Sequence, residues 1–336
     1  MDSQTGMIKS RITIIGDGSW ATALMKMLLA KGNRPGWFVR EKPRLDYILK
    51  HKRNPDYLPS LELDTEPITF YNDLNSAVQN SEILLFVIPS VYLKNSLTEL
   101  EGDLSDKYVV SAIKGIIPGD NILIADYFKS THKVNPDKYA VISGPSHAEE
   151  VAMEKLTYLT IAAGQNKYGR EIAELLSSSF IKTIVNEDVY GTEYAAALKN
   201  VMAIAAGICS SLNYGDNFQA VLISNAIQEI DRFLNRADPR IRDTKASSCL
   251  GDLLVTAYSQ FSRNRTFGTM IGKGYSVNSA VMEMHMVAEG YHAVKCIKHI
   301  NRLLLVNMPI TDAVYNILYE KISPGIEIRL LTEHIS

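Results

Sequence analysis

Lys199 is the residue whose surroundings most strongly indicate a chemical role. It lies in the run AAALKNVMA, within the most apolar helical pattern of the chain. Burial disfavours the charged form of an amine and lowers its pKa. A lysine in such a place must therefore form an ion pair or have a chemical role. The positions one helical turn away are Ala195 and Ala203, which offer no acid. The alternative is a side chain that extends along the helix to reach water. We favour a proton donor that acts near neutral pH.

Asp252 is the acid that we expect to pair with Lys199. It follows Gly251 in the stretch CLGDLLVT and precedes an apolar helical run. A carboxylate at a helix N-terminus has a simple structural explanation, because it interacts favourably with the helix dipole. A buried acid nevertheless needs a partner, and Lys199 is the natural candidate.

Lys114, in the stretch SAIKGI, directly follows a predicted central strand. Ligands of open α/β sheets bind outside the carboxyl ends of the strands, so this lysine is a candidate ligand-binding residue. A surface lysine just beyond a strand end explains the same stretch equally well.

The stretch ISGPSHAEE ends another predicted strand and leads into a helix. After Gly144, the hydroxyl of Ser146 either caps that helix or binds a small polar substrate together with neighbouring N–H groups. We interpret His147 as a polar surface residue and not as a catalyst.

A polar cluster precedes a later helix and consists of Ser262, Arg263, Asn264 and Arg265. Guanidinium and amide groups beside the free N–H groups of a helix start are well suited to a phosphate. The alternative is a solvated basic turn.

The stretch RITIIGDGSWATAL predicts a dinucleotide-binding turn between a buried strand and a helix. Gly16 allows the sharp turn, Gly18 lets a pyrophosphate approach the backbone, and Ala21 takes the third position of the G-x-G-x-x-G pattern. The glycine pair alone is a weak signal, but the repeated strand–helix units around it favour a dinucleotide. Asp17 is the unusual residue in this turn. We expect it to face outward or to cap the helix, without a function of its own.

The end of the second predicted strand bears on the choice of cofactor. A basic residue there accommodates the 2′-phosphate of NADP, whereas a carboxylate binds the 2′-hydroxyl of NAD. Arg40 stands at this position and Glu41 follows it. The pattern favours NADP over NAD, although a surface ion pair between these neighbours is the alternative.

The elements that must position these residues divide the chain into two parts. Apolar strands alternate with helical patterns in the first part, which predicts a mostly parallel, doubly wound sheet of the Rossmann type. The expected strands are 11–15, 36–40, 83–88, 108–113 and 139–143, with 156–163 and 181–186 extending the sheet. The expected helices of this part are 19–31, 91–101, 119–131 and 167–179. Helical patterns alone follow, at 189–212, 217–235, 246–259, 266–273, 277–284, 289–301 and 310–321. We therefore predict an α/β nucleotide-binding domain at 1–188 and an all-helical substrate-binding domain at 189–336.

Composition excludes several classes of protein. The 336 residues carry a formal net charge of −2, which gives no reason to expect nucleic acid or an anionic membrane surface as a partner. The cysteines, Cys209, Cys249 and Cys296, lack metal-ligand spacing, so we expect no metal and a reducing compartment. The first ten residues show no secretory signal, and the longest apolar helix is too short to insert into a membrane. These features predict a cytoplasmic protein.

In these stretches the sequence resembles the NAD(P)-dependent glycerol-3-phosphate dehydrogenases of the soluble bacterial type. The shared motifs follow the order of the family over nearly the whole chain: GDGSWATAL, NPDYLP, IPS, IKG, ISGPSHAEE, LKNVMAIAAGI, GDLLVT, SRNRTFG, VAEGY and MPIT. Their co-occurrence is far more specific than any single motif. Family members commonly have Ala in place of Asp17 and Gly in place of Ala21, and often a second basic residue in place of Glu41.

The resemblance implies reversible reduction of dihydroxyacetone phosphate to sn-glycerol 3-phosphate, which feeds phospholipid synthesis. Lys199 would be the general acid and base, with Lys114 and Asp252 beside it around the substrate. The further substrate contacts implied are Gly144, Ser146, Ser262, Arg263 and Asn264. Besides Gly16 and Gly18, the cofactor contacts implied are Ser19, Trp20, Arg40, Lys114, Ala148, Arg263, Val287 and Glu289.

Two other functions are compatible with parts of the pattern. A 2-keto or β-hydroxy acid reductase, such as a ketopantoate-type enzyme, also combines a Rossmann domain with helices and a lysine, but its carboxylate substrates do not need the cluster at Ser262–Asn264. A non-catalytic nucleotide sensor would not need Lys199, Asp252 and Lys114, all of which are present. The apolar faces of the helical part are compatible with a homodimer.

Overall fold

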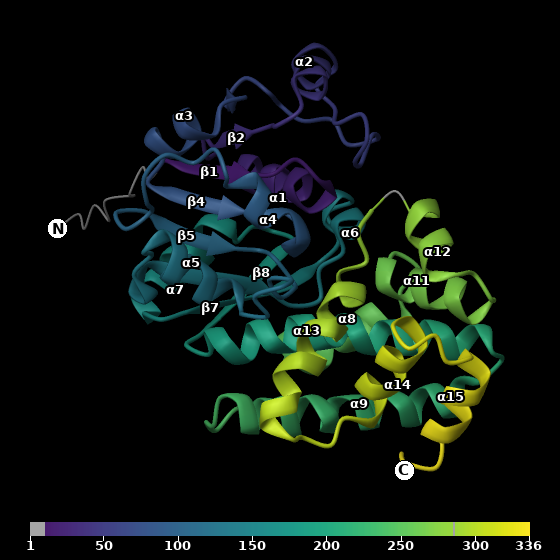
Figure 1. Cartoon of the computed structure of the whole chain (residues 1–336). Coiled ribbons are helices and arrows are strands. Elements are labelled where there is room, and N and C mark those ends of the chain that lie inside the picture. The colour runs from purple at the N-terminus through teal and green to yellow at the C-terminus, as the bar shows by residue number, and fades with distance from the viewer. Residues whose placement is uncertain (1–10, 285) are drawn as a thin grey trace.

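The structure is a computed structural model that describes residues 11–284 and 286–336. The first ten residues, on which the expected absence of a secretory signal depends, lie outside the described residues. In the described part, a sheet covered by helices is followed by a helical half (Figure 1). None of the helices in these two ranges combines the length and the apolar character that crossing a bilayer requires.

Within the described residues, eight strands form one sheet in the order β3-β2-β1-β4-β5-β6-β7-β8. Every neighbouring pair is parallel except β6 and β7, which run antiparallel. The strands are β1 (Ile12–Ile15), β2 (Gly36–Phe38), β3 (Thr69–Tyr71), β4 (Ile83–Phe86), β5 (Tyr108–Ser111), β6 (Tyr139–Ser143), β7 (Thr157–Ala163) and β8 (Ile181–Asn186). The predicted Rossmann-type sheet is confirmed, including its extension by the last two strands.

The central strands β1 and β4 are buried at every position, which explains their continuous apolar sequences. The edge strand β3 was not predicted. It has only three residues, none of them buried, so it lacks the apolar run that marks the others.

The helices of the sheet half are α1 (Ser19–Ala30), α2 (Lys42–His51), α3 (Leu74–Gln79), α4 (Ser90–Ser96), α5 (Ile124–His132), α6 (Ala148–Ala152) and α7 (Asn166–Leu176). The helix predicted at 119–131 begins only at Ile124, because Gly119 and Asn121 have left-handed backbone conformations. Helix α2 was not predicted, since only Leu45 and Ile48 of its residues are buried. Pro43 at its start is the signal that marks it.

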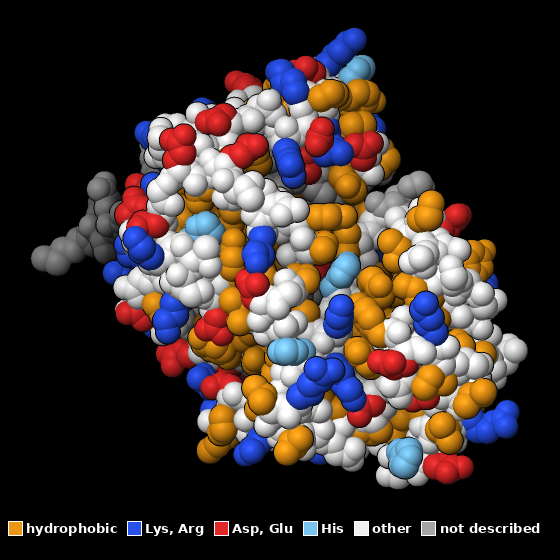
Figure 2. Space-filling view, in the orientation of Figure 1, with side chains coloured by type: hydrophobic (Ala, Val, Ile, Leu, Met, Phe, Trp, Pro, Cys, Tyr) orange, Lys and Arg blue, Asp and Glu red, His pale blue; other side chains and the backbone are white. Residues whose placement is uncertain are grey.

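The helical half consists of α8 (Val189–Ser211), α9 (Asp216–Ala237), α10 (Asp252–Tyr258), α11 (Arg263–Gly272), α12 (Val277–Glu283), α13 (Glu289–Leu304), α14 (Pro309–Leu318) and α15 (Pro324–Leu331). The predicted helix at 246–259 is not continuous, because a π-helical turn at Ser247–Gly251 precedes α10. Helix α15 was not predicted. Figure 2 shows acidic and basic side chains interspersed over one face of the molecule, in keeping with its small net charge.

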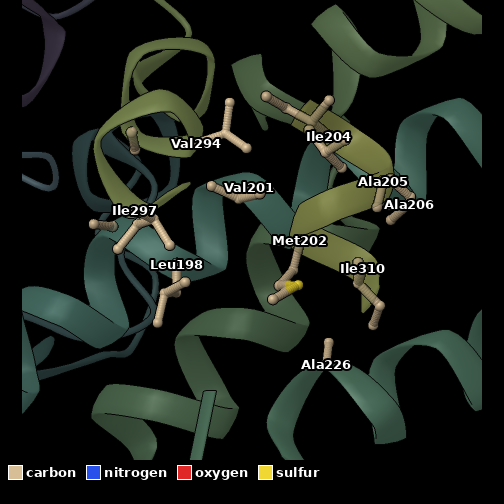
Figure 3. Close-up of a cluster of buried hydrophobic side chains, with 14 of the residues drawn as sticks. Leu198, Val201, Met202, Ile204, Ala205, Ala206, Ala226, Val294, Ile297 and Ile310 are labelled. Carbon is tan, nitrogen blue, oxygen red and sulfur yellow. The ribbon is translucent and has the colours of Figure 1, made fainter. Parts of the chain in front are cut away.

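Helix α8 forms the centre of the helical half and is buried along nearly its whole length. Its side chains, among them Leu198 and Met202, face residues of α9, α13 and α14, as Figure 3 shows for Ala226, Val294 and Ile310. The helix is apolar on all sides because neighbours surround it, which agrees with its continuous apolar sequence.

The contact between α8 and α11 depends on glycine. A Cβ atom added at Gly268 would lie 2.1 Å from the carbonyl oxygen of Ile204, and one added at Gly207 would lie 2.1 Å from the carbonyl oxygen of Arg265. Both obstacles are backbone atoms of a neighbouring helix, which cannot move aside as a side chain can. The two helix backbones therefore approach each other at distances that only glycine permits.

We expect Gly268→Ala to lower the free energy of unfolding by about 2 kcal/mol, because the added methyl group forces α8 and α11 apart. The matched control is Gly325→Ala in α15, where an added Cβ has no heavy atom within 4 Å. Alanine favours a helix over glycine, so the control should be neutral or stabilising by about 0.5–1 kcal/mol. Urea unfolding of both variants measures the difference, and equal changes would contradict the close-contact explanation.

Candidate active site

A cavity of about 200 Å³ lies between the sheet and helices α8, α10 and α11. Its sheet-side walls come from the segments that follow β1, β4, β5 and β6, so it lies at the carboxyl ends of these strands. Most of the predicted site residues line it: Gly18, Ser19, Trp20, Lys114, Ser146, Ala148, Lys199, Asp252, Ser262, Arg263, Asn264, Val287 and Glu289. Gly16, Arg40 and Gly144 are the predicted residues that do not line this cavity.

Asp252 binds a lysine with each of its carboxylate oxygens. Nζ of Lys199 lies 2.5 Å from Oδ1, and Nζ of Lys114 lies 3.0 Å from Oδ2. Lys199 and Asp252 are buried, whereas the side chain of Lys114 is 18% exposed. The predicted ion pair between Lys199 and Asp252 is therefore present, and Lys114 joins it from the end of β5.

Burial and charge shift the pKa values of this pair in a way that suits proton transfer. Burial lowers the pKa of Lys199 to about 7, because desolvation outweighs the attraction of Asp252. Burial alone would raise the pKa of Asp252, but Lys114 and Lys199 together outweigh it, and the pKa is lowered. At neutral pH the carboxylate is charged, and the buried amine exchanges its proton in the range that general acid–base catalysis requires.

The backbone at the end of β6 completes the surroundings of Asp252. The N–H of Gly144 donates to Oδ2 of Asp252 at 3.3 Å, and the carbonyl of Gly144 accepts from Nζ of Lys114 at 3.0 Å. Gly144 has φ +108, and an added Cβ would lie 2.8 Å from the carbonyl oxygen of Tyr158, so only glycine fits here. Ser146 is not a helix cap, because α6 begins after His147; its hydroxyl donates to the carbonyl of Gly144 at 2.9 Å.

Several residues of this network were missed by the sequence analysis, among them Thr256 and Asn200. Thr256 lies one turn after Asp252 on α10, and its hydroxyl accepts from Nζ of Lys199 at 2.9 Å. Asn200 follows Lys199 on α8, and its amide donates to the carbonyl of Lys114 at 2.8 Å. The four-residue spacing in GDLLVT was the available signal for Thr256, because it places both side chains on one face of a helix.

The polar cluster before α11 is partly occupied by structural hydrogen bonds. The hydroxyl of Ser262 caps α11 by accepting from the N–H of Arg265 at 3.2 Å. The amide of Asn264 donates to Asn200 Oδ1 at 3.0 Å, and its carbonyl oxygen accepts from the N–H of Gly290 at 2.9 Å. The alternative interpretation of this stretch, a solvated basic turn, is wrong because the side chains of Ser262 and Asn264 are buried.

Arg263 is the cation of this cluster that faces the sheet half. Its Nη2 donates to Oγ of Ser19 at 2.7 Å, across the cavity. Burial lowers the pKa of Arg263 against the opposing charges of Glu149 and Glu289, and among the described residues neither carboxylate forms an ion pair with it. A desolvated guanidinium without a carboxylate partner is well suited to binding an anion.

Glu289 connects the two halves at another wall of the cavity. Its carboxylate accepts from the N–H of Ser90 at 2.7 Å and from the hydroxyl of Ser90 at 2.5 Å. Burial raises the pKa of Glu289. Ser90, at the start of α4, belongs to the IPS motif but was not proposed as a site residue.

His147 and Trp20 both line the cavity, and each has a buried ring nitrogen without a hydrogen-bond partner in the described structure. The interpretation of His147 as a surface residue is wrong. Burial, together with the charge of Lys199, lowers the pKa of His147 to about 4, so the ring is neutral at pH 7. A neutral ring with that pKa does not compete with Lys199 as the proton donor.

The glycine turn fits the phosphates of a dinucleotide. Gly16 has φ +129, and an added Cβ would lie 2.3 Å from the carbonyl oxygen of Val87, so the chain can turn here only with glycine. An added Cβ at Gly18 would meet no heavy atom within 4 Å, which leaves open space beside the start of α1. Gly18 caps α1 without a side chain, so the first N–H groups of the helix remain available to an anion.

Arg40 lies at a second cavity of about 620 Å³, which adjoins the glycine turn. Its walls also contain Asp17, Glu41, Arg44 and Asp56. The expectation that Asp17 faces solvent or caps α1 is wrong: its Oδ2 lies 2.7 Å from Nη1 of Arg44, and only 18% of its side chain is exposed. The sequence pattern did not show this pairing because the two residues lie on separate elements.

Comparison with known proteins agrees with this geometry. Residues 11–169 match the model for the N-terminus of NAD-dependent glycerol-3-phosphate dehydrogenase, and residues 188–328 match the model for its C-terminus. The chain is 35% identical to glycerol-3-phosphate dehydrogenase [NAD(P)+] from Clostridium botulinum strain Eklund 17B, over 96% of this chain and 98% of the relative. It is 34% identical to the Syntrophomonas wolfei enzyme of the same name, over 92% and 90% of the two chains. The crystal structure of glycerol-3-phosphate dehydrogenase from Coxiella burnetii superimposes with a TM-score of 0.89 at 28% identity, and covers 96% of this chain and 99% of that one.

We expect Asp252→Asn to destabilise the protein by about 3–5 kcal/mol at pH 5.5, because it leaves two ammonium groups without their shared carboxylate. The pKa of Lys199 is about 7 with Asp252 present, and removal of that carboxylate lowers this pKa further. Between the two pKa values the folded variant has released a proton that the natural folded protein retains, so the loss in unfolding free energy should decrease as the pH rises from 5.5 to 7.5 and change little above that.

The matched control for this variant is Asp312→Asn, which removes an ion pair with Lys298 of 2.6 Å whose acid is 40% exposed. An exposed pair of this kind contributes at most about 1 kcal/mol. Urea unfolding at both pH values measures the two variants. Equal losses, or a loss for Asp252→Asn that grows with pH, would contradict the assignment of Asp252 as the shared counterion.

Proposed function

Because the chain belongs to the NAD-dependent glycerol-3-phosphate dehydrogenase family, we propose that the network around Asp252 is the active site for reversible reduction of dihydroxyacetone phosphate to sn-glycerol 3-phosphate. The enzyme uses NAD or NADP. The observation that supports the site most directly is the contact of the buried Lys199 amine with Asp252, in the cavity at the carboxyl ends of the parallel strands. The alternative of a 2-keto or β-hydroxy acid reductase is not favoured by the comparisons.

Lys199 is the general acid in this proposal. A nicotinamide bound in the cavity would supply a hydride to the carbonyl carbon of the substrate, so negative charge would develop on the carbonyl oxygen. The ammonium group of Lys199 stabilises that oxygen and gives it a proton. In the reverse direction the neutral amine accepts the proton of the hydroxyl group. A pKa of about 7 allows both forms near neutral pH.

Asp252 and Lys114 hold Lys199 in position and charge. Asp252 keeps the amine at one place, 2.5 Å from its Oδ1, and Thr256 supports the amine from the next turn of α10. Lys114 is the more exposed of the two lysines, so its ammonium group is placed to bind the substrate as well. Gly144 and Ser146 add the polar groups of the β6 end.

Arg263 is the group that we assign to the phosphate of the substrate or to the cofactor phosphates beside it. Its guanidinium is partly buried, faces Ser19 and forms no ion pair with a carboxylate among the described residues. Ser262 and Asn264 shape this end of the cavity, where the N-terminus of α11 adds its own N–H groups.

The residues that would hold the dinucleotide lie on both sides of the cavity. Gly16, Gly18, Ser19 and Trp20 form the turn for the phosphates, and the other members of the proposed set are Arg40, Lys114, Ala148, Arg263, Val287 and Glu289. The preference for NADP rests on Arg40 and stays a prediction. So do the division of the chain at residue 188, the homodimer, the cytoplasmic location and the supply of phospholipid synthesis.

We expect Lys199→Met to reduce turnover of dihydroxyacetone phosphate by about three orders of magnitude, because a general acid contributes about 10²–10⁴ to the rate. Methionine keeps the buried volume and removes the charge. Steady-state rates with NADH and with NADPH measure the loss and also test the cofactor preference. Binding of the dinucleotide, followed by fluorescence, should be retained.

The control for this experiment is Lys298→Met, which removes a partly exposed lysine of α13 outside the cavity. Its turnover should stay close to that of the natural protein. Near-normal turnover of Lys199→Met would remove Lys199 from its proposed role, and reduction of 2-keto acids in preference to dihydroxyacetone phosphate would favour the alternative enzyme.

The pKa of Lys199, lowered to about 7, predicts opposite pH dependences for the two directions of the reaction. Reduction needs the charged ammonium group, so its rate should fall as the pH rises through about 7. Oxidation of glycerol 3-phosphate needs the neutral amine, so its rate should rise over the same interval. Rates measured from pH 5.5 to 9 in both directions check this expectation, which parallel profiles would contradict.

A further inference from the structure

We propose that Arg44 is a positioning residue for cofactor binding, because it neutralises the carboxylate of Asp17 within the turn that receives the dinucleotide phosphates. The inference rests on the proposed function only in that the turn binds a dinucleotide. It concerns the residue of the turn that differs from the common family pattern.

The contacts of Arg44 place it between two acids. Its Nη1 lies 2.7 Å from Oδ2 of Asp17, and its Nε lies 2.8 Å from Oδ2 of Asp56. The guanidinium also lies over the ring of Tyr57, at 5.5 Å from the ring centre. The side chains of Arg44 and Asp17 are 19% and 18% exposed, so water screens this pair less than an ordinary surface pair.

A second set of hydrogen bonds ties the same segment to the turn. The amide of Asn54, which is completely buried, donates to the carbonyl of Asp17 at 2.9 Å and to Oγ1 of Thr22 at 2.9 Å. The hydroxyl of Thr22 donates to the carbonyl of Gly18 at 3.0 Å. The NPDY stretch is therefore held against the glycine turn, and it supplies both Asn54 and Asp56.

The charges explain why Arg44 is needed. The ionisable side chains that line the second cavity include three acids and two cations, namely Asp17, Glu41, Asp56, Arg40 and Arg44. Their formal balance of −1 would become −2 without Arg44. Asp17 lies between the glycines of the turn, so its charge would repel the phosphates of a dinucleotide. The ion pair with Arg44 directs this carboxylate to α2 and compensates its charge.

Two other roles of Arg44 predict different results. A direct ligand of the 2′-phosphate would matter for NADPH and not for NADH. A merely structural arginine would matter for folding, and removal of Asp17 would not compensate for its loss. The proposed role predicts an equal loss for both cofactors and recovery when the unpaired acid is also removed.

The experiment measures the dissociation constants of NADH and NADPH for the full-length protein by fluorescence or calorimetry. The variants are Arg44→Gln, Asp17→Asn and the double variant, with Arg44→Lys as the substitution that keeps the charge. Thermal unfolding of each protein without cofactor reports on folding. The matched control is Arg53→Gln, which removes a neighbouring arginine that pairs with Glu62 at 2.8 Å, outside both cavities.

We expect Arg44→Gln to weaken both cofactors by about tenfold or more, the effect of one uncompensated charge near the ligand. Asp17→Asn should bind them at least as tightly as the natural protein, the double variant should return to within about threefold of Asp17→Asn, and Arg44→Lys should lose less than Arg44→Gln. Raised salt should reduce the loss by screening. The control should bind both cofactors as the natural protein does.

Three results would overturn the inference. These are unchanged binding by Arg44→Gln, a loss confined to NADPH, and a loss for both cofactors that Asp17→Asn does not restore. The test is independent of the reaction, because a natural protein that binds NADH but does not reduce dihydroxyacetone phosphate would refute the proposed function and leave this inference standing.

Discussion

One carboxylate, that of Asp252, determines how the rest of the site can be arranged. It lies between the ammonium groups of Lys199 and Lys114, with one oxygen for each. Two cations so close together, one of them buried, are tolerable only with such a counterion, and a buried carboxylate is tolerable only with such partners. The three residues come from α8, α10 and the segment that follows β5. The sheet half and the helical half therefore have to meet at this point.

The helical side of this site is held together by helix backbones that approach each other closely. Gly207 and Gly268 bring α8 and α11 together, and an added Cβ at Gly290 would lie 2.5 Å from the carbonyl oxygen of Asn200. These glycines lie on α8, α11 and α13, the helices that carry Lys199, Arg263 and Glu289. Contacts between backbones leave little freedom of position, and this precision is what proton transfer over a hydrogen-bond distance requires.

The nucleotide end repeats the same electrostatic principle with a different geometry. Asp17 is an acid in a turn built to receive anions, and Arg44 makes its charge compatible with that task. In both cavities, a charge that would be unfavourable alone is paired with a group from a distant part of the chain. Asn54, Asn200 and Asn264 hold the supporting backbone with neutral amide groups, which satisfy carbonyl and N–H groups without adding charge.

The sequence by itself determined the classes of element and the main chemical groups. Apolar strands, the glycine turn and an apolar helix containing Lys199 are local patterns, so the Rossmann-type sheet, the helical half and the pairing of Lys199 with Asp252 followed from them. Partners held by tertiary contacts left no such pattern. Arg44 opposite Asp17, Asn200 opposite Lys114 and Ser90 opposite Glu289 lie on separate elements, and the short helix α2 buries too few residues to show a period. Only the tertiary structure decided these pairs, because hydrogen bonds and charges act through distance in space and not along the chain.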